Sequence, residues 1–152
     1  MAPIDLVVSY AVHMLFAAAW TGAVLFFAWA VLPLARDGTV APEVLGRTTG
    51  KLTTLTRASA VVLFVTGGHQ AGRLYTVESL TGSQLGHLVV TMLVLWLALA
   101  ALVEIGASKI RSGVDEEKVR TPAHDAHTIF RAASVVAVLL LLDAGVLAVG
   151  GF

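Results

Sequence analysis

The stretch that decides the fold is LVVSYAVHMLFAAAWTGAVLFFAWAVLPL, at residues 6–34. It contains no charged side chain, and a helix needs about 20 mostly apolar residues to span a bilayer. The stretch is therefore long enough to cross a membrane with tilt, or to project beyond it. It is a poor signal peptide, because no basic segment precedes it and because its apolar run is too long.

Three further apolar stretches follow, at residues 52–72, 85–103 and 129–150. Over the whole chain 57% of residues are hydrophobic and 13% are charged, with a mean hydropathy of +0.86. Soluble domains carry about 25% charged residues. The sequence therefore predicts an all-α polytopic membrane protein, a single transmembrane domain over residues 1–152 that forms an antiparallel bundle of four transmembrane helices.

The basic residues predict the orientation of these helices. Cytoplasmic loops are enriched in Lys and Arg, and nine of the ten basic residues lie in or beside the first and third linkers: Arg36, Arg47, Lys51, Arg57, Lys109, Arg111, Lys118, Arg120 and Arg131. Only Arg73 belongs to the second linker. We therefore expect a multi-pass protein of the cell membrane with both termini on the extracytoplasmic side.

The composition also excludes several classes of function. The chain has no cysteine, so disulfides, thiolate metal sites and iron–sulfur clusters are excluded. A net charge of zero without a basic stripe argues against nucleic acid as a partner. No phosphate-binding loop, nucleophile elbow or paired-histidine metalloprotease motif is found. The expected surroundings are the lipid bilayer.

Candidate functional residues are the ionisable groups inside the spans, which membrane helices rarely carry without a role. His13, His69, His87 and Asp143 each belong to a different span, and the alternating helix directions bring them to the same extracytoplasmic half. Imidazole suits copper, zinc and iron. The three histidines are predicted as ligands of a metal, or two of them as axial ligands of a haem, with Asp143 as an acceptor that orients a ligand histidine.

Each of these residues also has a simpler interpretation. His69 and His87 lie near the ends of their spans, where water reaches them, and Asp143 is compatible with a purely structural partnership. Trp20 lies seven residues after His13 on the same helix face, where it would line a porphyrin pocket or pack in the core. Met14 and Met92 are soft ligands for copper or ordinary core residues. His124 and His127 share a helix face and form a second, weaker candidate for a metal site.

The first two spans resemble the copper resistance D (CopD) family. The family pattern of a histidine, small apolar residues, Trp-x-Gly and an apolar run that ends in proline is matched by His13, Trp20, Gly22 and Pro33. Thr66-Gly67, after Thr56-Arg57, is similar to the end of the family's second helix, and Arg131 fits the start of its last helix.

The resemblance implies copper handling or transport at the outer face of the membrane. The family is distantly similar to HemJ-type protoporphyrinogen oxidases, whose first-helix histidine corresponds to His13. Their third-helix lysine is missing here, because residues 85–103 contain none. Haem b binding by His13 with His69 or His87, as in a small cytochrome or a haem-linked oxidoreductase, stays open as an alternative. The third hypothesis is a subunit without a cofactor. A homo-oligomer or a redox partner is compatible with all three hypotheses.

Overall fold

The computed structural model describes residues 3–150, and these residues form helices and short connections without a strand. The first helical rod runs from Ile4 to Asp37 as α1 (Ile4–Phe26), η1 (Phe27–Val31) and α2 (Leu32–Asp37). The other long helices are α3 (Pro42–Leu74), α5 (Gln84–Val114) and α6 (Arg120–Ala148), and a short helix, α4 (Val77–Gly82), lies between α3 and α5. The all-α class predicted from the sequence is confirmed.

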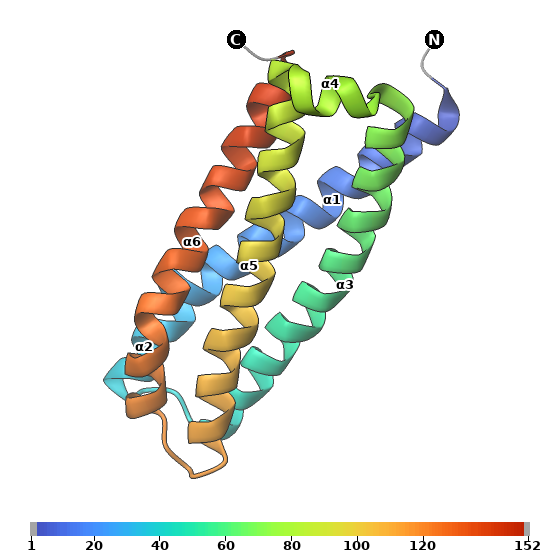
Figure 1. Ribbon diagram of the computed structural model, residues 1–152. Coiled ribbons are helices and arrows are strands. Elements are labelled where there is room, and N and C mark those ends of the chain that lie inside the picture. The colour runs from blue at the N-terminus through green and yellow to red at the C-terminus, as the bar shows by residue number, and fades with distance from the viewer. Residues whose placement is uncertain (1–2, 151–152) are drawn as a thin grey trace.

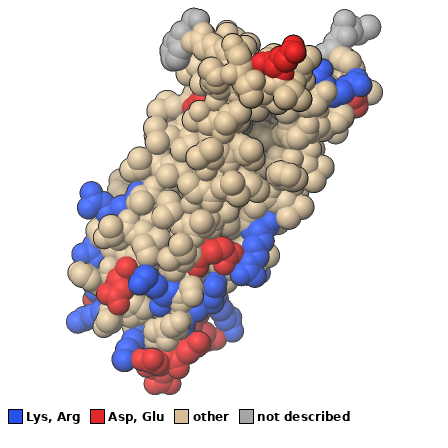
Figure 2. Space-filling view, in the orientation of Figure 1, with Lys and Arg blue, Asp and Glu red and all other residues tan. Residues whose placement is uncertain are grey.

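The long helices lie side by side and change direction at each connection (Figure 1). Helix α5 packs against α6 and α3, and α1 packs against α3 and α6. Ile4, α4 and Ala148 lie at one end of the molecule, called here the α4 end (Figure 1). The opposite end carries the connections 38–41 and 115–119 and most of the charged side chains, and is called the charged end (Figure 2).

Three helices within residues 3–150 are long and apolar enough to cross a membrane: Ile4–Asp37, Gln84–Val114 and Arg120–Ala148. The sequence predicted four spans, and α3 is the helix that differs. Its buried face carries Thr49, Thr53, Thr56 and Ser59 alongside three leucines. The hydroxyl groups of Thr49 and Thr53 donate to the carbonyls of Leu45 and Gly50 at 2.8 and 3.0 Å, which the helix tolerates, while the polar side chains lower its hydropathy.

The uncharged surface between the two ends is rich in large apolar side chains. Trp29 is 89% exposed, Phe26 65% and Val61 65%, and exposed Leu and Val residues also occur along α5 and α6. Soluble monomers rarely expose continuous apolar areas of more than a few hundred Å². Together with the three apolar helices, this surface indicates a membrane protein whose helices contact lipid.

The buried core lies toward the charged end. Its largest fully buried members include Trp20, Leu45, Leu99, Ile110 and Phe130, which come from all four long helices. The rings of Phe27 and Phe130 have their centroids 4.8 Å apart, and Gly106 allows Phe130 to lie directly against α5. None of the large buried apolar residues lies in the last turns next to α4, so the helices are packed less tightly there.

The first rod contains one irregular turn. In η1 the N–H of Leu32 donates to the carbonyl of Phe27, a π-type bond five residues back. Pro33 follows directly and has no N–H to continue the α-helical pattern. The turn with the extra residue is therefore placed where proline has already interrupted the hydrogen-bond ladder.

Candidate functional site

A cavity of about 340 Å³ opens between the helices in the half of the molecule nearer α4. Residues from α1, α3, α4, α5 and α6 line it, and most of these residues are apolar. Its volume is at the lower end of the range for small-molecule sites. The looser packing beyond the core therefore leaves a cavity with few polar groups on its wall.

His13 is the histidine on the cavity wall, which Tyr10 and Tyr75 also line. Its Nδ1 lies 2.7 Å from the Thr66 hydroxyl, which itself lies 2.7 Å from the carbonyl of Val62 on its own helix. The Thr66 proton is used in the bond to Val62, so Nδ1 donates and Thr66 accepts. In a neutral imidazole the other nitrogen, Nε2, is then the unprotonated one, with its lone pair available to a ligand.

The backbone of α3 is shaped to receive this ring. A Cβ atom added at Gly67 would lie 3.2 Å from Cε1 of His13, closer than an ordinary contact. Ser9 adds a further link, since its hydroxyl donates to the Thr66 carbonyl at 3.2 Å and accepts from Gln70 Nε2 at 3.3 Å. The Thr66-Gly67 pair, noted in the sequence only as part of a family pattern, therefore positions His13.

Two thioethers line the same cavity as His13. Met14 follows it on α1 and is 54% exposed, and Met92 comes from α5 and is partly buried. One imidazole and two thioethers form a donor set that suits Cu(I). The chemistry of these cavity-lining residues is thus compatible with a copper ion.

The other two predicted ligands are engaged elsewhere. His69 Nε2 lies 3.3 Å from the carboxylate of Asp5, which also pairs with Arg73 at 3.4 Å. His87 Nε2 donates to the carbonyl of Thr81 at 2.9 Å and is exposed. Neither residue lines the cavity, and residues 3–150 contain no group of three His, Cys, Asp or Glu side chains that could hold a metal. The structure therefore does not bring His13, His69 and His87 together.

Asp143 lies on α6 and is only 8% exposed. Its Oδ2 atom is buried without a hydrogen-bond partner in the described part of the chain. Asp143 was predicted to accept a hydrogen bond from a ligand histidine, but at His13 the acceptor is the hydroxyl of Thr66. Asp143 is a buried polar group that the cavity geometry does not use.

Trp20 belongs both to the buried core and to the cavity wall. It is fully buried, and its indole N–H donates to the Thr56 hydroxyl at 3.0 Å, which ties α1 to α3. It also lines the cavity, so the core and pocket interpretations of this residue both describe its position.

Trp96 on α5 is a further aromatic residue on the cavity wall. It is stacked on Phe64 with centroids 5.7 Å apart, and its buried Nε1 has no partner among the described residues. The sequence carries no signal that separates this tryptophan from a lipid-facing one.

His124 and His127 lie at the charged end, far along α6 from the cavity. His124 is an exposed neighbour of Asp125, with 4.0 Å between its Nδ1 and the carboxylate. No third ligand accompanies the pair in residues 3–150.

Comparison with protein-family models, with curated proteins and with solved structures found no match.

Proposed function

We propose that the chain is a CopD-like membrane protein that binds copper in the cavity near α4, with His13 as the principal ligand. The observation that carries the proposal is the hydrogen bond from His13 Nδ1 to Thr66. It fixes the ring and leaves the lone pair of Nε2 available to a metal ion in the cavity that Met14 and Met92 also line. Copper is here the cargo that the protein handles or transports.

His69 and His87 enter this proposal as later ligands. To join His13, the first would release Asp5 and the second would release the carbonyl of Thr81. Both lie at the α4 end, so a metal ion that approaches the cavity from that side passes them first. Their position supports an entry role more directly than a place beside His13.

The proposal includes a fourth span formed by α3, so that α1, α3, α5 and α6 make an antiparallel transmembrane bundle in the cell membrane. Val61, Phe64 and Val65 of α3 are all more than 60% exposed, as expected for lipid contact. Arg57 is the charged residue within the predicted span 52–72, and it forms a bidentate pair with Glu104 of α5, at 2.7 and 3.0 Å. The charged end would be cytoplasmic and the α4 end extracytoplasmic.

The test is a Cu(I) titration of the purified protein in detergent against a chromophoric Cu(I) chelator. We expect His13→Ala to abolish tight binding, while His124→Ala, at the other end of α6, leaves it unchanged. His69→Ala and His87→Ala are expected to slow loading more than they weaken the final complex. If the wild-type protein competes no better than His13→Ala, the copper proposal fails.

Haem b is the second candidate, and a specific observation favours it. The cavity wall combines the one imidazole with the aromatic side chains of Trp20, Phe64 and Trp96, surroundings that suit a flat apolar ring. His13 would supply an axial nitrogen, and a second histidine would come from His69 or His87 only after the contacts described above are broken. A Soret band in protein purified with sufficient haem, absent from His13→Ala, would select this candidate over copper.

A further inference from the structure

The charged end contains two arginines that differ from the rest. Among residues 3–150, five of the seven arginines bind a carboxylate or a carbonyl: Arg47 with Glu43, Arg57 and Arg111 with Glu104, Arg73 with Asp5, and Arg120 with the Asp37 carbonyl. Arg36 and Arg131 form no ion pair or hydrogen bond within that range. Neither guanidinium group therefore has a hydrogen-bond or ion-pair partner among the described residues.

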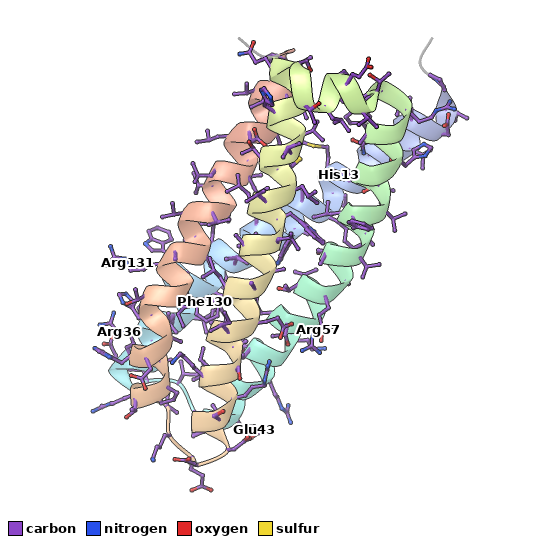
Figure 3. The ribbon with its side chains drawn as sticks, in the orientation of Figure 1. His13, Arg36, Glu43, Arg57, Phe130 and Arg131 are labelled. Carbon is purple, nitrogen blue, oxygen red and sulfur yellow. The ribbon has the colours of Figure 1, made fainter. Side chains whose placement is uncertain are left out.

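These two arginines come from different helices and lie near each other. Arg36 is in α2 and Arg131 is in α6, and the two helices pack against each other. His127, one turn before Arg131, has both arginines among its charged neighbours. Both side chains point outward from the same side of the molecule (Figure 3).

No acidic side chain compensates this cluster. Asp37 and Asp125 are the nearest carboxylates along the two helices. Asp125 lies 4.0 Å from His124, and neither aspartate pairs with Arg36 or Arg131 in the described residues. Two neighbouring guanidinium groups without a carboxylate repel each other and favour an anion between them. Phosphate fits best, because its oxygens accept the paired N–H groups of arginine.

The apolar residues beside the two arginines indicate that the phosphate belongs to a lipid. Val135 and Val138, one and two turns beyond Arg131 toward α4, are 60% and 43% exposed. Leu34 and Trp29, on the same rod as Arg36, are 50% and 89% exposed. The cluster therefore lies where the charged end meets the apolar surface, so that a ligand held by its phosphate there would lay acyl chains along α1 and α6.

We propose that Arg36 and Arg131, together with the neighbouring His127, bind the phosphate headgroup of an anionic glycerophospholipid. Basic sites between helices at the cytoplasmic interface are known to hold such headgroups. The lipid would tie the first rod to α6 at the end where the π-type turn and Pro33 interrupt the rod. The proposal is independent of the metal site, which lies in the opposite half.

The test uses the full chain in detergent, titrated with phosphatidylglycerol or phosphatidylcholine and followed by native mass spectrometry. We expect a clear preference for phosphatidylglycerol, and Arg36→Gln/Arg131→Gln should weaken its binding at least about tenfold. Arg47→Gln/Lys51→Gln removes the same charge from α3 at the same end and should keep the preference. Because Arg131 is exposed, Arg131→Gln alone serves if the double variant does not fold, with a loss of about fivefold.

Three outcomes would overturn the proposal. One is equal binding of the two lipids by the wild-type protein. Another is an equal loss in both double variants, which would reduce the effect to net charge. The third is displacement of the lipid by inorganic phosphate at millimolar concentration, which would assign the cluster to a free anion.

Discussion

The imidazole of His13 owes its orientation to a hydroxyl on the neighbouring helix. The Thr66 hydroxyl donates its hydrogen bond to the Val62 carbonyl and so acts toward His13 as an acceptor. Partners of this kind orient ligand histidines and set their tautomer. The role does not depend on a charged group, which is why Asp143, the carboxylate expected from the sequence, is not needed there.

Replacing Thr66 tests this orientation directly. Thr66→Val keeps the shape of the side chain and removes the acceptor, so Cu(I) affinity should fall about 10–100-fold. Thr66→Ser keeps the hydroxyl and should bind nearly as well as the wild type. Chelator competition measures both variants, and equal affinity of the valine and serine variants would contradict the role given to the hydroxyl.

The adjacent glycines offer a matched pair at the same scale. A Cβ at Gly67 meets the His13 ring at 3.2 Å, whereas a Cβ at Gly68 meets nothing within 4 Å. Alanine favours a helix over glycine by up to about 1 kcal/mol. We expect Gly68→Ala to gain most of that free energy of unfolding, and Gly67→Ala to gain less and to bind Cu(I) more weakly. Thermal unfolding in detergent and chelator competition would show the difference.

At the scale of the helices, the closest packing is between α5 and α6. A Cβ atom at Gly106 would lie 2.7 Å from the Phe130 ring, and one at Gly113 would collide with the ring of Pro122. Pro122 and Phe130 are both buried. The two glycines thus let α6 approach α5 along the whole charged half, as small residues do between membrane helices.

Gly106→Ala should therefore lower the free energy of unfolding by about 1–3 kcal/mol, the usual range for an overpacked core. Gly145→Ala is the control, because an added Cβ there meets nothing within 4 Å on the same helix pair. Thermal unfolding followed by circular dichroism in one detergent would compare the two variants. An equal transition temperature for both would show that α5 and α6 separate more easily than the structure indicates.

The whole molecule has a closed half and an open half. Large buried side chains fill the half near the charged end, and the cavity occupies the half near α4. The packed half thereby supports the looser half that contains the cavity. Orientation in the membrane decides which side of the membrane can reach the cavity.

Cysteine labelling can determine that orientation, since the chain has no cysteine of its own. We expect Glu78→Cys, in α4, to react with a membrane-impermeant thiol reagent added to intact cells. Asp115→Cys, at the charged end, should react only after the cells are opened. The reverse pattern would place the cavity on the cytoplasmic side, and labelling of both sites in intact cells would refute a single orientation.

Much of the fold was accessible from the sequence, because hydropathy locates the apolar part of each helix. The predicted stretches 52–72 and 85–103 are the apolar portions of α3 and α5, but the helices extend to 42–74 and 84–114. Their polar turns are stabilised by neighbours, which hydropathy does not register. Helix α6 likewise extends the predicted stretch 129–150 back to Arg120. Helix α4, capped by Thr76 and Ser79, went unnoticed.

The candidate site was predicted less completely. His13 was recognised because a histidine deep in a span is rare, but depth alone cannot tell which histidines meet. His69 and His87 share its half of the molecule and still face Asp5 and Thr81. Contacts of this kind depend on the rotation of each helix, which a list of positions along the chain does not contain.

That rotation gives the π-type turn at Phe27–Val31 its significance. Each residue of an α-helix turns the chain by about 100°, and this turn accommodates one residue more than a regular helix would. It therefore sets the phase of the segment that carries His13 relative to the segment anchored at the charged end. Deleting one residue of the turn, such as Ala28, should convert it into a regular α-helical turn and keep His13 directed at Thr66, whereas deleting one residue from the regular part of α1 after His13 should rotate the ring away from Thr66 by about 100°.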